Sequence, residues 1–270
     1  MLLVRAAPYF FDSSRVSTVF EYATMQPTIA TPPFHRALDD LTLSVVSGVR
    51  TDLTPETVLR EFLDGKTAMA ITWLSATASE SDKVADFPIA ISKLPSANAR
   101  YRRQDREWSE LKEDDSAGVT VLGMDGRLGG VSRSAKNAGL ANVFLAWATG
   151  PEQTAKLAPR SSHTGPSRRS HEKGSQSWVN SELPNEISAD YFKAVSEAFG
   201  RSAAIHFPRL PGQAKYVAAL DDAVASAIAG EQTSEQTLRK VGEEWQSITK
   251  QFGLDAQKSA YRKSLGVSVD

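Results

Sequence analysis

The stretch GGVSRSAKNAGLANVFLAW, Gly129 to Trp147, places two adjacent glycines and a polar run directly before an apolar helix pattern. Ser134 or Asn137 in the polar run can cap this helix. The apolar residues that recur at helical spacing are Leu140, Phe144 and Trp147. A double glycine before a helix allows either a tight turn or a close approach of the backbone to a ligand, and the rest of the chain must distinguish the two.

Helix and strand patterns alternate on the N-terminal side of this stretch. Threonine followed by proline predicts two helix starts, in TPPFHRALDDL (Thr31–Leu41) and TPETVLREFLDGK (Thr54–Lys66). Short apolar runs predict strands in TAMAITW (Thr67–Trp73), DFPIAISKLP (Asp86–Pro95) and GVTVLG (Gly118–Gly123). The highly charged segment between the last two runs predicts a surface excursion.

Three longer helix patterns fill the last third of the chain. They are SADYFKAVSEAFG (Ser188–Gly200), GQAKYVAALDDAVASAIAG (Gly212–Gly230) and TSEQTLRKVGEEWQSITKQFG (Thr233–Gly253). The last of them opens with a capping-box pattern, Thr233 to Gln236, and carries an apolar stripe from Leu238 to Phe252. Helices outnumber strands and alternate with them, which predicts an α/β fold class.

The composition is that of an ordinary globular protein, with 270 residues, of which 41% are hydrophobic and 23% charged. A net charge of −1 argues against nucleic acid as a partner, because such binders carry a basic excess. The absence of cysteine excludes disulfides and thiolate metal sites. No apolar run is long enough to span a membrane, and Arg5 and Pro8 interrupt the apolar N-terminus, so no signal peptide is predicted.

The motifs that carry catalysis or cofactor binding are missing from the sequence. It contains neither a GxGxxG nor a P-loop pattern, so no cofactor is predicted. Ser161 and His163 stand almost side by side, but adjacent residues rarely point at one another and no GxSxG elbow is present. His163 and His171 have no third ligand nearby, so no metal is predicted. The carboxylate pairs, which solvation explains well, are Asp39-Asp40, Asp114-Asp115 and Asp221-Asp222.

Aromatic residues remain as candidates for ligand contact. Trp73 ends an apolar strand pattern, and Tyr216 opens a long amphipathic helix. Aromatic rings stack on the C–H faces of sugars while their polar edges form hydrogen bonds. For each of these residues, packing in the core is the alternative interpretation.

Four segments, taken in order, resemble a known family. They are FLDGKTAMAITW (Phe62–Trp73), GGVSRSAKNAGLANVFLAWATGPEQTAKLA (Gly129–Ala158), GPSRRS (Gly165–Ser170) and YVAALDDAVASAIAGEQTSEQTLRKVGEEWQSI (Tyr216–Ile248). FEYATMQPTIATPPFHRAL (Phe20–Leu38) resembles the family segment that precedes them. The chain thereby resembles the extracellular solute-binding proteins of ABC importers, in the sugar-binding group that includes maltose-binding protein.

The resemblance implies a periplasmic-binding-protein-like type II clamshell that closes on a small, sugar-like solute and delivers it to an ABC permease in the membrane. It implies that Trp73 and Tyr216 stack on the ligand and that Gly129 and Gly130 offer backbone groups at a hinge. It also implies that Arg168 hydrogen-bonds the ligand or locks the lobes. The implied lobes are residues 1–126 (second lobe), 127–168 (a returning segment of the first, with hinge crossings) and 169–270 (C-terminal helices of the second).

The resemblance further implies a receptor that lacks the N-terminal signal and most of the first lobe, because family members carry both before the segments that match. A complete receptor of this kind works in the periplasm or cell envelope. Without the first lobe, the helix with Leu140, Phe144 and Trp147 is predicted to expose an apolar patch. Two alternatives stay open, a hydrolase that uses Ser161 and His163 or the paired carboxylates, and a truncated remnant that binds no solute.

Overall fold

In a computed structural model, the chain forms two compact units, each built from segments that are separate in the sequence. The first unit comprises Met1–Thr51, Leu94–Met124 and Arg201–Asp270, and the second comprises Asp52–Lys93 and Asp125–Gly200. The structure describes residues 1–10, 17–48, 50, 53–71, 87–92, 94, 96–112, 119–121, 129–157, 185–199, 204–205 and 209–267.

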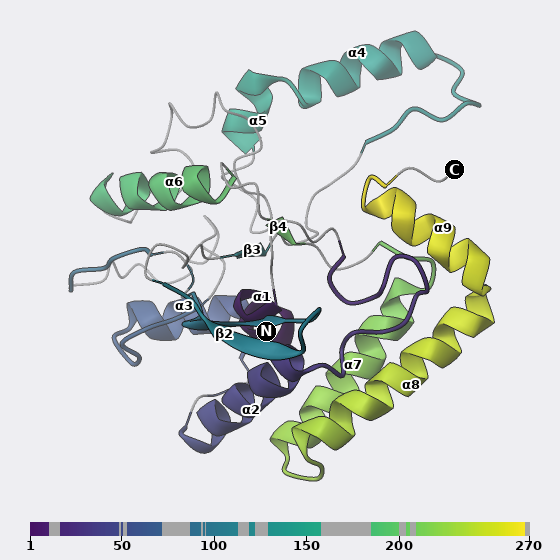
Figure 1. The fold of residues 1–270 in the computed structure, drawn as a ribbon. Helices are drawn as coiled ribbons and strands as arrows, with labels where there is room; N and C mark the ends of the chain where they lie inside the picture. Colours follow the sequence, from purple (N-terminus) through teal and green to yellow (C-terminus); the bar gives the residue numbers. More distant parts are fainter. Residues whose placement is uncertain are drawn as a thin grey trace. The chain divides into compact units, whose positions relative to one another are not determined.

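The first unit is mainly helical. Its helices are α1 (Leu2–Phe10), α2 (Pro32–Val46), α7 (Gln213–Ile228), α8 (Ser234–Phe252) and α9 (Leu254–Ser264). Two small sheets accompany them: β1 (Ala99–Arg102) pairs antiparallel with β2 (Glu107–Glu110), and β3 (Thr120–Val121) pairs parallel with β4 (Ala204–Ile205). In Figure 1, α7 and α8 run side by side as a helical hairpin, and α1 packs against α2.

The described part of the second unit contains four helices, α3 (Pro55–Leu63), α4 (Ala138–Ala148), α5 (Pro151–Leu157) and α6 (Asn185–Phe199). The predicted boundaries of α3 and α4 are confirmed. Thr54 caps α3 by accepting the Thr57 N–H at 3.3 Å, and Asn137 caps α4 by accepting the Leu140 N–H at 3.1 Å. Pro151 then starts α5 directly after Gly150, as the sequence predicts.

In the first unit, the helices that the sequence predicts are α2, α7 and α8, and their starts are confirmed apart from one cap; α1 and α9 are not predicted. The capping box of α8 is present, since Thr233 accepts the Gln236 N–H and the Gln236 side chain accepts the Thr233 N–H, both at 3.2 Å. α2 begins at Pro32 as predicted, but the Thr31 hydroxyl does not cap it. This hydroxyl instead donates to the Thr28 carbonyl at 2.8 Å, so the side chain is engaged with the preceding turn.

The strand predictions are largely wrong where the structure describes them. Residues 67–71 and 87–92 form no strand. Met69 is 88% exposed and Ile71 51%, so the apolar residues from Thr67 to Ile71 are not on a buried face, and no strand among the described residues pairs with them. Over the described residues of the three predicted strands, GVTVLG alone contains a strand, the two-residue β3. The charged excursion, by contrast, contains the β1–β2 hairpin, whose turn uses Arg106 at φ 56°.

One aromatic cluster forms the centre of the first unit. Phe20 packs against three rings, with centroid distances of 5.1 Å to Trp245, 5.5 Å to Tyr216 and 5.7 Å to Tyr261. Tyr216 and Trp245 also meet edge to face at 5.7 Å. Edge-to-face pairs place the positive ring edge against the negative face, which adds to the free energy gained by burial. The cluster joins the segment before α2 to helices α7, α8 and α9.

Truncation of Trp245 should therefore destabilise the chain far more than truncation of an exposed tryptophan. Trp245 is fully buried and donates its Nε1–H to the Tyr216 carbonyl at 2.9 Å. We expect Trp245→Ala to lower the free energy of unfolding by about 3–5 kcal/mol, and Trp147→Ala to change it by less than about 0.5 kcal/mol. Urea unfolding followed by circular dichroism measures both, and equal losses would contradict the described core.

Candidate functional site

The structure distributes the predicted ligand contacts over both units. Gly129 and Gly130 are exposed residues of the second unit, just before α4, whereas Tyr216 lies in the core of the first unit. Trp73 and Arg168 lie outside the described residues. So do Ser161 and His163, on which the hydrolase alternative depends.

The double glycine is not explained by a left-handed turn. Neither Gly129 nor Gly130 has a positive φ, although six other glycines of the described part do. A Cβ added at Gly129 would instead stand 2.8 Å from Cδ2 of Leu145 on α4, whereas one added at Gly130 would meet open space. Gly129 is thus the point at which the backbone passes close to α4. Gly130 leaves its backbone groups open to solvent, as close approach of a ligand requires.

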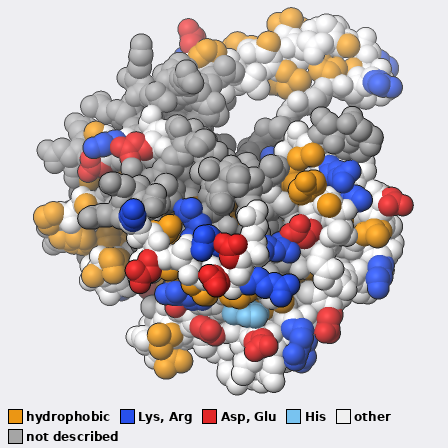
Figure 2. Space-filling view, viewed as in Figure 1, with side chains coloured by type: hydrophobic (Ala, Val, Ile, Leu, Met, Phe, Trp, Pro, Cys, Tyr) orange, Lys and Arg blue, Asp and Glu red, His pale blue; other side chains and the backbone are white. Residues whose placement is uncertain are grey.

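The helix after the glycines exposes the apolar patch that the sequence predicts. Leu140 is 65% exposed, Phe144 59% and Trp147 55%, and no side chain of α4 is buried. Figure 2 shows hydrophobic side chains along this helix at the top of the view. A helix that is apolar on most of its surface normally packs inside a protein. The exposed α4 therefore has the composition of an interaction surface.

Tyr216 packs in the core, which is the alternative to ligand contact that the sequence leaves open. Only 1% of its surface is exposed. Its hydroxyl forms a hydrogen bond with Thr249 Oγ1 at 2.9 Å, and the Thr249 hydroxyl lies 2.8 Å from the Trp245 carbonyl, to which it donates. Burial raises the pKa of the Tyr216 hydroxyl, which the hydrogen bond with Thr249 partly offsets. The ring faces other aromatic rings, and its polar edge is satisfied within the core.

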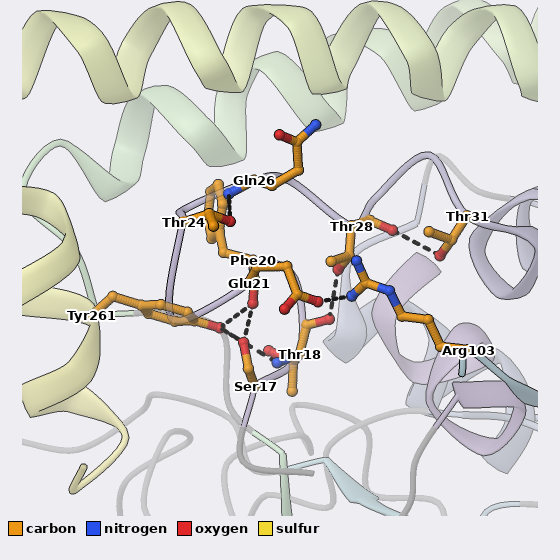
Figure 3. Close-up of polar contacts among 10 residues, drawn as sticks. All are labelled: Ser17, Thr18, Phe20, Glu21, Thr24, Gln26, Thr28, Thr31, Arg103 and Tyr261. Carbon is orange, nitrogen blue, oxygen red and sulfur yellow. Dashed lines mark hydrogen bonds and ion pairs between the residues drawn. The ribbon is translucent and has the colours of Figure 1, made fainter. Parts of the chain in front are cut away.

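The segment from Ser17 to Thr31 is fixed from two sides (Figure 3). On one side, the Tyr261 hydroxyl on α9 lies 2.8 Å from Ser17 Oγ and accepts the Thr18 N–H at 3.4 Å. On the other side, Glu21 forms an ion pair with Arg103 of the β1–β2 hairpin. The segment that resembles the known family at Phe20–Leu38 is therefore anchored by partners more than 80 residues away in sequence.

His35 on α2 is a titratable group whose pKa is shifted by burial. Its Nε2 atom is buried and finds no hydrogen-bond partner among the described residues. Burial lowers the pKa of His35, and the carboxylates of Glu235 and Asp39 counteract this shift only in part. The neutral imidazole is therefore the form that the fold favours.

Sequence analysis missed one group of side chains on the β1–β2 hairpin. Trp108 on β2 is 39% exposed and lies against Tyr101 of β1 and Tyr9 of α1. A usable signal was present, because Tyr101 and Trp108 stand in two short segments on either side of a polar turn, RQDRE. The density of charge in the segment obscured that pattern.

Within the described part of the chain, no cluster of three or more His, Cys, Asp or Glu residues has the arrangement of a metal site. Among the same residues, no helix combines the length and the apolar character needed to cross a membrane.

Comparison with known proteins gives one family. The model of the family described as bacterial extracellular solute-binding protein matches residues 23–185, which is more than half of the chain. The match contains three of the four resembling segments, including the double glycine and α4, and leaves the last, Tyr216–Ile248, outside. None of the curated proteins compared with the chain matches it.

The close passage at Gly129 predicts a difference between two neighbouring alanine substitutions. Gly129→Ala places a methyl group against Leu145, and we expect it to lower the free energy of unfolding by about 1 kcal/mol. Gly130→Ala, the matched control, should change it by less than about 0.5 kcal/mol, because its methyl group meets open space. Chemical denaturation measures both. The losses of Gly129→Ala and Leu145→Ala should be non-additive in the double variant, and additivity would contradict this contact.

His35 predicts a pH dependence of stability. Its pKa is lower in the folded chain than the unfolded value of about 6.5, so the unfolded state binds more protons and the free energy of unfolding falls as the pH drops through this region. The contribution is fully present above the unfolded pKa. His35→Gln should flatten the decline between about pH 7.5 and pH 5.5, measured by urea unfolding. Because the other three histidines are unchanged in the variant, an unaltered slope would contradict the shift.

Proposed function

Because this chain belongs to the bacterial extracellular solute-binding protein family, we propose that it is the receptor of an ABC importer for a sugar or a similarly polar solute. The family consists of non-enzymatic receptors, and membership implies binding of a small solute and association with an ABC transporter. It also implies a periplasmic-binding-protein-like fold. The observation that carries the proposal is the family match over residues 23–185, which includes the exposed double glycine.

The proposed mechanism is solute binding followed by hinge closure. Backbone groups at Gly130 are accessible because the residue is exposed and a Cβ added there would meet open space, and Gly129 fixes their position through its close approach to Leu145. Trp73 stacks on the solute and Arg168 hydrogen-bonds it or locks the closed form, as the resemblance implies. The role of Tyr216 in this proposal is structural, because its ring and hydroxyl hold α7 against α8.

The lobe assignment belongs to the same proposal. We assign residues 1–126 and 169–270 to the second lobe of a type II clamshell, and residues 127–168 to a returning segment of the first lobe. The second compact unit resumes at Asp125, next to the proposed crossing at residue 127, but it also contains Asp52–Lys93 and continues to Gly200, so its other boundaries differ from those of the proposed lobes. The exposed apolar face of α4 is the surface that such a first lobe would cover. The receptor acts in the cell envelope, beside its permease.

Solute binding should appear as thermal stabilisation of the full chain. A ligand at one hundred times its dissociation constant adds about 2.7 kcal/mol to the free energy of unfolding. We expect at least one member of a panel of neutral sugars, polyols, sugar acids and amino acids to raise the melting temperature saturably. Trp73→Ala should weaken the effect and Tyr22→Ala, at an exposed ring, should not. A flat response to the whole panel would contradict the receptor proposal.

A double substitution separates the receptor from the hydrolase alternative. Ser161→Ala combined with His163→Ala removes the nucleophile–base pair named in the hydrolase alternative. In a receptor, this variant should bind the solute with an affinity within about twofold of the parent chain, since neither residue has a proposed contact. Isothermal titration of both chains measures this. Turnover of a solute that the double variant abolishes would instead establish an enzyme.

A further inference from the structure

The β1–β2 hairpin and helices α1 and α2 bring five side chains of unusual combination together on the surface of the first unit. Trp108 meets the ring of Tyr9 edge to face at 5.8 Å and that of Tyr101 at 5.5 Å. The Arg36 guanidinium lies over both Tyr9, at 4.8 Å, and Trp108, at 5.3 Å. The Tyr9 hydroxyl donates to Asp40 Oδ2 at 2.8 Å. We call this group the Trp108 cluster.

The Trp108 cluster holds an indole in one orientation while leaving part of it in water. Trp108 is 39% exposed although two aromatic rings and a guanidinium already pack against it. Because Arg36 lies over the indole ring and two tyrosine rings pack against it, the exposed part of Trp108 is an apolar surface with little conformational entropy left to lose on binding. Such a surface matches the C–H face of a sugar ring, which is apolar and of similar size.

The polar groups beside the indole select the charge of the ligand. Arg36 supplies guanidinium donors, and Asp40 supplies carboxylate acceptors, on the same helix one turn apart. The Tyr9 hydroxyl remains protonated well above neutral pH, because burial and Asp40 both raise its pKa. A ligand with hydroxyl groups can accept from Arg36 and donate to Asp40 at once. An anion meets repulsion from Asp40, and a cation meets repulsion from Arg36.

We propose that the Trp108 cluster is a binding surface for a neutral pyranose sugar, with the ring stacked on Trp108 and its hydroxyl groups bonded to Arg36 and Asp40. This inference rests on the proposed function, since it names the chemical class of the solute and one surface that contacts it. The surface belongs wholly to the first unit, so it is complete within that unit.

The competing role of the cluster is mechanical, since the same contacts attach the hairpin to α1 and α2. The two roles differ in what they require of the indole. Attachment needs an aromatic ring at position 108 and tolerates phenylalanine, which keeps the edge-to-face contacts with Tyr9 and Tyr101. Sugar binding needs the larger flat surface and the polar pair, so it is sensitive to Trp108→Phe and to Asp40→Asn even when folding is preserved.

The experiment titrates the full chain with D-glucose, D-galactose and maltose, and follows the indole Nε1–H signals of its five tryptophans by ¹⁵N NMR. D-glucuronate and D-glucosamine serve as the anionic and cationic probes. We expect a saturable shift of the Trp108 signal with at least one neutral sugar. Trp108→Ala should weaken binding by about tenfold and Asp40→Asn by about threefold. Trp147→Ala, at a more exposed indole of the second unit, should leave binding unchanged.

Each outcome decides between the two proposals. A neutral sugar that binds the chain without moving the Trp108 signal, and equally well to Trp108→Phe, overturns the Trp108 site and leaves the receptor function standing. Glucuronate or glucosamine that binds as tightly as the neutral sugars overturns the charge selection. A panel in which no sugar binds but another solute does overturns the Trp108 cluster as a sugar-binding surface and leaves the receptor function standing. If Trp108→Ala fails to fold, the signal shift in the parent chain and the weaker binding of Trp108→Phe still test the site.

Discussion

The contact between Phe20 and the rings of Tyr216, Trp245 and Tyr261 is the interaction on which the described part of the first unit depends. Helices α7, α8 and α9 follow one another in the chain and form local contacts quickly. Phe20 lies almost 200 residues before the nearest of these three rings, so closing that loop costs entropy that only a strong contact offsets. A fully buried aromatic cluster supplies such a contact.

The packing of Phe20 also positions residues on the surface, through two connections. The segment that carries Phe20 also carries Glu21, whose ion pair with Arg103 attaches the β1–β2 hairpin. The same segment runs directly into α2, which presents Arg36 and Asp40 on its outer face. The geometry of the Trp108 cluster therefore depends on the packing of Phe20 in the core, because the segment that carries Phe20 is connected to both the hairpin and α2. A rigid core that holds polar and aromatic side chains in place on the surface preorganises a binding site, which is what a receptor without catalytic chemistry requires.

The sequence predicts those features whose physics is local. Caps at Thr54, Asn137 and Thr233 are hydrogen bonds over three residues, so their signatures need no tertiary information. The strand at Thr67–Trp73 fails over its described part because a strand exists only with a partner, and pairing is not encoded within one segment. Tyr216 looks like a binding residue by type, and only its neighbours from α8 and from the segment before α2 reveal its packing role. The Trp108 cluster draws on α1, α2 and the hairpin, a combination that no single stretch of sequence displays.

The two units differ in how their stability is built, and this difference bears on how solute binding should be felt. Every residue of the main hydrophobic core cluster lies in the first unit, whereas the described part of the second unit buries only Leu59 and Ile187 as large apolar side chains. Regions with few buried apolar contacts open locally at low free energy cost. A solute bound at Gly129 and Gly130 would therefore act next to α4, a helix that buries no side chain, and would suppress local opening of α4 before global unfolding changes. A solute bound at Trp108 would act on a unit that its own core already holds together, so its stabilising effect would follow mass action on global unfolding.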